Sequence, residues 1–487
     1  MFTERMTNPM KLYELLAGTG ISAGYVKEDT EIVSITCDSR RVEPGCLFVC
    51  IAGTAVDGHN FAQQAYQAGA AAVVVQRDMG LLNQLLVENS RMAWAQLCAN
   101  WFGHPASRLK MVGVTGTNGK TTTTTLIKSM LEHEGHKVGL IGTIHNLIGD
   151  RIIPTHHTTP DPYDLQSLLA LMVVEGCEYC VMEVSSHALD QRRVAGCEYE
   201  VGVFTNLTQD HLDYHGTMEN YMLAKKEMFS ISRYGIANLD DAWAQQITAG
   251  VPCPMTTYSV KNDAADYVAR NVSYRADGVD FELVGGDKIG QVKMQIPGQF
   301  SVYNGLCAAA VCLQLGMTFE RVVEALSAAA GVKGRAEVVP TGRDFTVVID
   351  YAHTPDGLEN ICRTLKECCA GRLVTLFGCG GDRDKTKRPL MGATAAALSD
   401  YLVVTSDNPR SEDPAAIIED ILPGVRDAGT PYTVVENRVE AIRWAIDNAQ
   451  PGDTVLLAGK GHETYQILKD ETIHLDEREV VAEALAR

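Results

Sequence analysis

The segment that most constrains the fold is the run Gly-Val-Thr-Gly-Thr-Asn-Gly-Lys-Thr-Thr at positions 113–122. An apolar stretch, Leu109–Val114, precedes it and predicts a buried strand, and a helix-like stretch, Thr121–Glu134, follows. A strand, a glycine-rich turn and a helix N-terminus form a cradle for phosphate, because backbone amides and the helix dipole favour an anion there. The sequence therefore predicts a nucleoside triphosphate site, with Lys120 at the terminal phosphates and Thr121 on Mg²⁺.

The spacing of the glycines departs from the strict phosphate-loop pattern. Val114 occupies the position of the first glycine, and the glycines stand at 113, 116 and 119. A Gly-Lys-Thr triplet alone occurs by chance and fits a simple helix start. The strand before it and the helix after it favour nucleotide binding over that alternative.

Length and composition limit the class of protein. A chain of 487 residues is too long for one ordinary core, so we expect about two to four domains. Its 42 Lys and Arg against 61 Asp and Glu give a net charge of −19, which opposes a nucleic-acid partner but not a local anion site. No apolar run is long enough to span a membrane, and Met1–Met10 lacks the apolar core of a signal peptide. The 14 scattered cysteines are expected to be reduced thiols in the cytoplasm.

The pattern of apolar runs divides the chain into three blocks, 1–107, 108–333 and 334–487. Strands alternate with helices, which predicts α/β domains and, in the second and third blocks, parallel strands in a wound sheet. The expected strands are Ile32–Thr36, Leu47–Ile51, Ala72–Val75, Val138–Ile141, Tyr179–Val184, Val201–Asn206, Thr346–Ile349, Arg372–Phe377, Tyr401–Thr405 and Thr454–Leu457. The expected helices are Phe61–Ala68, Tyr221–Phe229, Tyr303–Leu315, Ala415–Ile421 and Arg438–Ala449, with linkers at Phe102–Arg108 and Gly331–Gly334 and a β-rich insert at 255–297.

Polar residues follow two strands of the central block. Glu183–His187 ends one of them, and a carboxylate beside a triphosphate loop is a natural Mg²⁺ ligand; the serines of this segment could equally cap the next helix. Asn206–Asp213 ends the next strand, and its acids and histidine fit either a metal or phosphate site or a solvated turn. Lys225 and Lys226 lie on the following helix, where a lone lysine is usually solvated.

Three polar loops follow strands in the third block, at Gly378–Lys385, Ser406–Arg410 and Ala458–Glu463. The carboxyl ends of parallel strands meet at one edge of a sheet, so these loops are expected to share one rim. Arginine binds a carboxylate through its fork, and Asp and Glu hold an ammonium group. The combination fits a zwitterionic amino acid, although Asp-Asn-Pro-Arg alone could be a turn.

Taken in order, these motifs resemble the Mur ligase family over nearly the whole chain. The matching segments are Thr115–Thr122, Glu183–His187, Asn206–His211, Ala224-Lys225, Gly298–Asn304, Gly334-Arg335 and Asp350–Pro355. The resemblance implies an α/β protein of three domains. They are an N-terminal uridine-nucleotide-binding domain (1–107), a central P-loop ATPase-type wound sheet (108–333) and a C-terminal Rossmann-like domain for the amino acid (334–487).

Within the family, the chain resembles members that add the third residue to UDP-N-acetylmuramoyl-L-alanyl-D-glutamate. Cys37–Arg40, Thr158–Pro160 and Gln191–Arg193 carry this resemblance, although relatives often have Asn in place of His157. Asp407–Arg410 is similar to the signature of members that add meso-diaminopimelate, and lysine-adding relatives depart from it at its last positions. The resemblance implies an ATP-dependent ligase, monomeric and cytoplasmic, in peptidoglycan precursor synthesis.

The resemblance also implies roles for individual residues. ATP is bound by Thr115, Gly116, Thr117, Asn118, Gly119, Lys120, Thr121, Asn304, Arg335 and Asp350. Mg²⁺ is held by Thr121, Glu183, His211 and Lys225, the last carbamylated, and the catalytic set is Lys120, Glu183, His211 and Lys225. The UDP-muramoyl dipeptide is bound by Ser39, Thr158, Thr159, Ser185, Gln191 and Arg193. Diaminopimelate is bound by Arg383, Asp407, Asn408, Pro409, Arg410, Gly459 and Glu463.

The implied chemistry begins when the D-glutamyl carboxylate attacks the γ-phosphate of ATP. The resulting acyl phosphate is then attacked by the amine, in a site that closes at the linkers to keep water out. A ligase with another substrate, such as a folylpolyglutamate synthase, is one alternative, and Asp407–Arg410 and the N-terminal domain oppose it. A switch NTPase is a second alternative, and it explains neither Lys225 nor the C-terminal rim.

Overall fold

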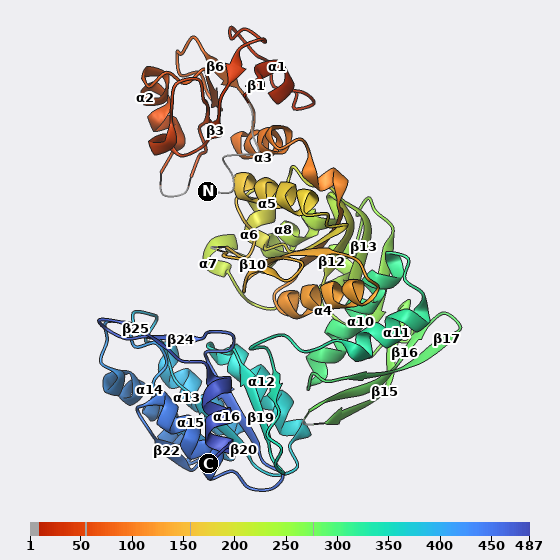
Figure 1. Cartoon of the computed structure of the whole chain (residues 1–487), viewed down its shortest axis with the longest axis vertical. Coiled ribbons are helices and arrows are strands. Elements are labelled where there is room, and N and C mark those ends of the chain that lie inside the picture. The colour runs from red at the N-terminus through yellow and green to blue at the C-terminus, as the bar shows by residue number, and fades with distance from the viewer. Residues whose placement is uncertain (1–8, 54–55, 156, 276) are drawn as a thin grey trace. The chain divides into compact units, whose positions relative to one another are not determined.

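The computed structural model describes residues 9–53, 56–155, 157–275 and 277–487, and positions 1–8 of the expected N-terminal domain lie outside them. The chain divides into two compact units, Met1–Tyr258 and Ser259–Arg487. Their helices and strands are labelled in Figure 1. In the part of the chain that is described, no helix is long and apolar enough to cross a bilayer. All 14 cysteines are free thiols in the described structure.

The N-terminal sheet of the first unit has four parallel strands in the order β3-β4-β5-β6. They are β3 (Ile35–Thr36), β4 (Leu47–Val49), β5 (Ala72–Val75) and β6 (Gln84–Leu86), with helices α1 (Leu12–Leu15), α2 (Ala62–Gln67) and α3 (Ser90–Trp101). Val49 and Val74 pack with α1 and α3, whereas Phe48 and Val73 pack with α2. Successive strand residues point to opposite faces, so helices cover both faces of this sheet.

The central sheet of the first unit has β7 (Lys110–Thr115) near its middle. Parallel strands run in the order β8-β11-β7-β12-β13-β14, and the antiparallel strands β9 and β10 extend the β8 edge. The other strands are β8 (Val138–Ile141), β9 (Asn146–Ile148), β10 (Arg151–Ile153), β11 (Tyr179–Glu183), β12 (Tyr199–Phe204), β13 (Ser232–Asn238) and β14 (Met255–Ser259). This arrangement confirms the predicted wound parallel sheet.

Six helices accompany the central sheet. They are α4 (Lys120–His133), α5 (Pro162–Val174), α6 (Ser186–Asp190), α7 (Leu212–His215), α8 (Met218–Ser230) and α9 (Ala244–Thr248). The chain leaves β7 through α4 toward β8 on one side and leaves β11 through α6 toward β12 on the other. Such a reversal is the switch point of a wound sheet, where ligands bind beyond the carboxyl ends of the strands.

Two expectations for the first unit are wrong in part. The predicted strand Ile32–Thr36 is two strands: β2 (Glu31–Ile32) pairs antiparallel with β1 (Met10–Lys11), whereas β3 pairs parallel with β4. The expected linker at 102–108 ends in a 3₁₀ helix, Pro105–Arg108, which contacts α5. Ala106 is buried there in the core of the central sheet. Apolar contacts therefore hold this segment in place, although its glycine and proline predicted a loop.

The second unit begins with an antiparallel meander of β15 (Tyr267–Arg275), β16 (Gly278–Gly285) and β17 (Lys288–Met294). The helices α10 (Gln299–Gln314) and α11 (Phe319–Ala328) pack on it. The predicted β-rich insert is thereby confirmed. The following helix begins at Gln299, earlier than the predicted start at Tyr303.

The C-terminal sheet has the order β18-β19-β23-β20-β21-β22, and all of its strands are parallel except β18. They are β18 (Glu337–Val339), β19 (Thr346–Asp350), β20 (Leu373–Phe377), β21 (Tyr401–Val404), β22 (Tyr432–Val434) and β23 (Thr454–Ala458). Helices α12 (Pro355–Cys368), α13 (Lys387–Leu398) and α14 (Pro414–Ala428) share one core, and α15 (Arg438–Asp447) and α16 (Glu477–Leu485) share another. A hairpin, β24 (Tyr465–Ile467) and β25 (Thr472–His474), completes the unit.

A fully buried ion pair joins α15 and α16 to the carboxyl edge of this sheet. The side chains of Arg438 and Glu477 are both 0% exposed, and their charged atoms lie 2.7 Å apart. The Arg438 guanidinium also donates to the carbonyl oxygens of Ala458 at 2.8 Å and of Ser406 at 3.4 Å. One side chain therefore anchors the starts of the loops that follow β23 and β21.

We predict that Arg438→Met destabilises the protein by about 3–5 kcal/mol, because it leaves the Glu477 carboxylate buried without its counter-ion. Urea unfolding measures the change. Arg438→Met/Glu477→Leu, which removes both charges, is expected to recover most of the loss. Arg363→Met, at a residue that is 60% exposed on α12, is the control and should cost less than about 1 kcal/mol. A loss as small as that control for Arg438→Met would contradict the assignment.

Candidate functional site

The loop between β7 and α4, residues 116–119, is held at the N-terminus of α4 by the segment that follows β12. Gly116 has a φ of 149° and Gly119 a φ of 83°. A Cβ atom at position 116 would lie 1.9 Å from Thr205 Oγ1, so no larger residue fits there. The Asn118 backbone NH donates to Asn206 Oδ1 at 2.9 Å. The loop thus presents its backbone at a helix N-terminus, where an anion is stabilised.

Two lysines converge on this loop. Lys120 Nζ donates to the carbonyl oxygens of Gly116 at 2.9 Å and Thr117 at 2.8 Å, and Lys225 Nζ donates to the same Gly116 oxygen at 2.8 Å. Lys225 is 1% exposed, and its Nζ lies 4.5 Å from the centroid of the Tyr221 ring. Burial, and secondarily the charge of Lys120, holds the pKa of Lys225 well below the ordinary lysine value. Lys225 therefore differs from the solvated lysine that is usual on a helix.

Glu183 ends β11 and is 1% exposed. Its carboxylate accepts hydrogen bonds from Thr121 Oγ1 at 3.0 Å, from the Thr143 backbone NH at 2.9 Å and from Thr143 Oγ1 at 3.0 Å. The structure thus brings together Thr121 and Glu183. Sequence analysis missed Thr143, although it follows the parallel strand β8 and the rule for strand ends applied to it equally.

The oxygen atoms around Glu183 fit a hard divalent cation. A carboxylate beside hydroxyl groups at a phosphate-binding loop is the donor set that Mg²⁺ prefers, and phosphate oxygens and water supply its remaining ligands. Across the described residues, no group of three or more His, Cys, Asp or Glu side chains forms a metal site by itself.

His211 lies in a separate aromatic cluster after β12. Its ring centroid is 4.8 Å from that of His187 and 6.2 Å from that of Tyr221, and its Nε2 is 3.4 Å from Asp210 Oδ2. Burial lowers the pKa of His187, and the neighbouring His211 lowers it further. In the described structure, no hydrogen bond joins His211 to Glu183. Tyr221, which contacts both His211 and Lys225, was not singled out from the sequence.

Most of the residues expected to bind the UDP-muramoyl peptide form one hydrogen-bonded network. Thr159 Oγ1 donates to Glu183 O at 2.9 Å and accepts from the Ser185 backbone NH at 3.0 Å. Arg193 donates to Gln191 Oε1 at 2.7 and 3.0 Å and to Thr159 O at 3.1 Å.

Two further residues expected to bind this peptide lie elsewhere in the first unit. Thr158 Oγ1 lies 3.1 Å from Thr143 Oγ1. Ser39 begins a 3₁₀ helix, Ser39–Arg41, between β3 and β4 of the N-terminal sheet. No hydrogen bond of the described structure joins Ser39 to the network around Thr159.

In the second unit, Arg335 and Asp350 lie together at the start of the C-terminal sheet. The Arg335 guanidinium stacks 5.1 Å from the centroid of the Tyr351 ring. Asp350 Oδ2 accepts from the Ala336 backbone NH at 2.7 Å, and burial raises the pKa of this carboxyl group although Arg335 opposes the shift. Asn304 lies on α10.

The three polar loops of the C-terminal sheet form one rim, as predicted. Asn408 Nδ2 donates to Glu463 Oε2 at 2.9 Å, which joins the loops after β21 and β23. Arg410 Nη1 donates to Gly381 O at 2.8 Å, which joins the loop after β21 to the loop after β20. A Cβ atom at Gly459, whose φ is 114°, would lie 2.6 Å from Asp407 Oδ2.

Pro409 and Arg383 lie at the end of this rim, and each forms a hydrogen bond to a residue close to it in the chain. The Pro409 carbonyl accepts from the Glu412 backbone NH at 3.1 Å. Arg383 Nη1 donates to the carbonyl oxygen of the adjacent Asp382 at 3.1 Å, a hydrogen bond within one loop.

Lys460 is a residue of this rim that the sequence analysis gave no role. Its side chain is fully buried, and its Nζ donates to Asn408 Oδ1 at 3.0 Å and to Glu463 Oε2 at 2.9 Å. The ammonium group therefore balances the Glu463 carboxylate and fixes the Asn408 amide. The sequence feature that could have identified Lys460 is its position between two glycines in a loop that follows a strand.

Comparison with known proteins identifies the family of the chain. Family models match at residues 114–312 (Mur ligase middle domain), 334–461 (Mur ligase, glutamate ligase domain) and 31–91 (Mur ligase family, catalytic domain). The chain is 47% identical to the UDP-N-acetylmuramoyl-L-alanyl-D-glutamate–2,6-diaminopimelate ligase of Caldanaerobacter subterraneus subsp. tengcongensis, over 98% of this chain and 99% of that protein. The protein of the same name from Syntrophomonas wolfei subsp. wolfei is also 47% identical, with 98% and 99% covered.

A solved structure of a ligase with this name has the same fold. It covers 98% of this chain and 99% of its own, with a TM-score of 0.76 and 32% sequence identity. The predicted α/β fold class is confirmed by this similarity. The chain belongs to the Mur ligase family.

Proposed function

We propose that this ligase adds meso-diaminopimelate to the D-glutamyl carboxylate of UDP-N-acetylmuramoyl-L-alanyl-D-glutamate, with hydrolysis of ATP to ADP and phosphate. The observation that carries the proposal is the 47% identity, over 98% of the chain, to a relative of that name. The protein acts as a monomer in the cytoplasm in this proposal, and its 14 free thiols suit a reducing compartment.

The chemistry follows from the side chains around the nucleotide loop. The D-glutamyl carboxylate attacks the γ-phosphorus of ATP, the bond to ADP breaks, and an acyl phosphate forms. Lys120 offsets the negative charge of the transferred group. The neutral amine of diaminopimelate then attacks the acyl carbon, the C–N bond forms, phosphate leaves, and the amine loses a proton to solvent.

Mg²⁺, when bound, screens the repulsion between the carboxylate and the triphosphate. Thr121 and Glu183 are suited to hold it, and His211 and Lys225 are the further ligands in our proposal. Lys225 can serve only after its amine adds CO₂ and releases a proton, because the product is an anionic carbamate. Its burial and lowered pKa support this step, since the neutral amine is the nucleophile.

The C-terminal rim is the proposed site of the amino acid. Arg410 and Arg383 are the proposed partners of the distal carboxylate of diaminopimelate, a group that lysine lacks. Asp407 and Glu463 are the proposed partners of an ammonium group. The hydrogen bonds between the loops support this assignment, because they hold the cationic and anionic groups on one rim.

The first prediction concerns substrate choice. With ATP, Mg²⁺ and the UDP-muramoyl dipeptide, phosphate release should depend on meso-diaminopimelate and be at least ~100-fold less efficient, in kcat/KM, with L-lysine. The reason is the missing carboxylate, which leaves the proposed arginine partners without their counter-ion. Efficient use of lysine would agree with the ligase activity but would contradict the proposed specificity for diaminopimelate. Release that needs no amino acid would contradict the ligase itself.

The second prediction tests Arg410. Arg410→Lys should raise the KM for diaminopimelate ~10–100-fold and leave the KM for ATP unchanged, because a point charge replaces a bidentate fork. Steady-state phosphate release measures both constants. Arg426→Lys, at a residue 54% exposed on α14, is the matched control and should behave as the wild type. An equal rise in both constants for Arg410→Lys would indicate folding damage instead.

The third prediction tests Lys225. Lys225→Ala should lower kcat more than ~100-fold, because a proposed metal ligand is removed. Bicarbonate should not restore the activity, whereas a small carboxylic acid should restore part of it. Lys226→Ala is the matched control: this neighbour is partly exposed and donates to Gln246 O and Ala249 O, so the activity of the variant should be retained. Near-normal activity of Lys225→Ala would exclude Lys225 from the mechanism.

A further inference from the structure

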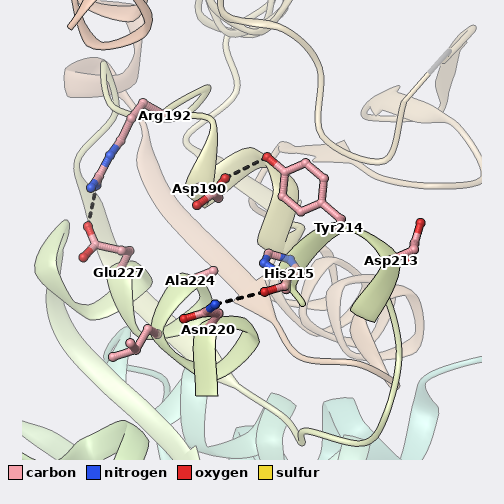
Figure 2. A pocket seen from close by; sticks show the side chains of 9 residues that line it. Asp190, Arg192, Asp213, Tyr214, His215, Asn220, Ala224 and Glu227 are labelled. Carbon is pink, nitrogen blue, oxygen red and sulfur yellow. Dashed lines mark hydrogen bonds and ion pairs between the residues drawn. The ribbon is translucent and has the colours of Figure 1, made fainter. Parts of the chain in front are cut away.

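An open pocket of about 750 Å³ lies on the first unit beside the proposed peptide site. Figure 2 shows its walls, in which Asp190 and Tyr214 face each other and Arg192 and Glu227 form a second pair. Asp190 and Arg192 flank Gln191 in sequence, and Gln191 itself belongs to the hydrogen-bonded network around Arg193. The pocket therefore lies next to Gln191, a residue that we propose to bind the UDP-muramoyl dipeptide.

The Tyr214 hydroxyl connects the pocket to that network. It donates to Asp190 Oδ2 at 2.7 Å and accepts from Gln191 Nε2 at 3.1 Å. Its ring is held by packing, with centroids 4.3 Å from His187 and 4.8 Å from His215. A hydroxyl has one proton, and here the Asp190 carboxylate takes it, so only a lone pair remains for Gln191.

This arrangement determines which way the Gln191 amide points. Tyr214 can only accept, so the NH₂ end of the amide faces Tyr214 and the oxygen faces Arg193. That oxygen accepts two bonds from the Arg193 guanidinium, at 2.7 and 3.0 Å. In the reversed orientation, two donor groups would face each other at Arg193, which is unfavourable.

We propose that Tyr214 and Asp190 are positioning residues that fix Gln191 and Arg193 in the orientation that binds the UDP-muramoyl dipeptide. The inference rests on the proposed function, because it assigns the two oriented side chains to that substrate. Tyr214 and Asp190 act from the pocket side through hydrogen bonds and without contact to the substrate.

The protonation of Tyr214 is consistent with this role. Burial raises the pKa of its hydroxyl, and the hydrogen bond to the Asp190 carboxylate raises it further. The phenol therefore keeps its proton through the neutral and mildly alkaline range, and the direction of the hydrogen bonds does not change there.

The experiment compares three variants with the wild type. Tyr214→Phe removes the acceptor of the Gln191 amide NH₂, so this side chain is no longer held at that end. The affinity for the UDP-muramoyl dipeptide, measured by calorimetry, should fall about tenfold. Asp190→Ala frees the Tyr214 proton to turn toward Gln191 and should weaken binding to a similar extent. Asp190→Asn keeps an oxygen acceptor and should bind nearly as well as the wild type.

The kinetic readout separates positioning from general damage. In Tyr214→Phe, the KM for the dipeptide should rise about tenfold, while kcat and the KM values for ATP and diaminopimelate stay within about twofold. Glu227→Gln is the matched control, because Glu227 lines the same pocket and pairs with Arg192. It should behave as the wild type in every constant.

Three results would overturn the inference. The first is an unchanged dipeptide affinity in Tyr214→Phe, and the second is an equal change in all three KM values of that variant. The third is a loss of affinity in Asp190→Asn as large as in Asp190→Ala. The two proposals fail differently. If the wild-type protein does not bind the dipeptide, both fall; if it binds and Tyr214→Phe binds equally well, only the positioning role falls.

Discussion

The parallel pairing of β7 with β11 is the constraint on which the nucleotide site depends. Its register sets Glu183 opposite Val114, so the carboxylate leaves the sheet beside the loop that begins at Thr115. A slip of one residue would turn Glu183 to the other face and away from Thr121. The glycines of the loop then allow the backbone to pass Thr205 closely enough for α4 to begin there. The backbone hydrogen bonds between these buried strands therefore determine which side chains meet at the site.

Charge is arranged on this scaffold in two different ways. At the nucleotide loop, Lys120 and Lys225 donate to one carbonyl oxygen, an arrangement that an anion nearby stabilises. At the C-terminal rim, the charges are paired internally, because the buried Lys460 contacts Glu463 and Asn408. In our proposal, the first site attracts phosphate, and the second recognises a zwitterion by shape and by the positions of fixed charges.

The sequence predicted those features that depend on local pattern. Most strands inside the sheets, the helix after Gly119 and the polar loops at strand ends were found, because each has a signal within a few residues, whereas β13 was not predicted. The pairing of strands was not: Ile32–Thr36 divides between two sheets, and Ala106 enters a core although it lies in a segment that was expected to be a linker. Thr143 follows the end of β8, where a local rule applied, but its contact with Glu183 joins positions 40 apart in the chain and was not predictable from local pattern.

By itself, the sequence determined the fold class, the nucleotide loop and the resemblance to Mur ligases, because these follow from residue types at fixed spacing. Only the tertiary structure decided which side chains meet. It placed Lys225 in a buried position against Gly116, inserted Lys460 between two loops, and set the Tyr214 hydroxyl between Asp190 and Gln191. Burial and hydrogen-bond direction depend on neighbours that are distant in the chain, so spacing along one segment cannot specify them.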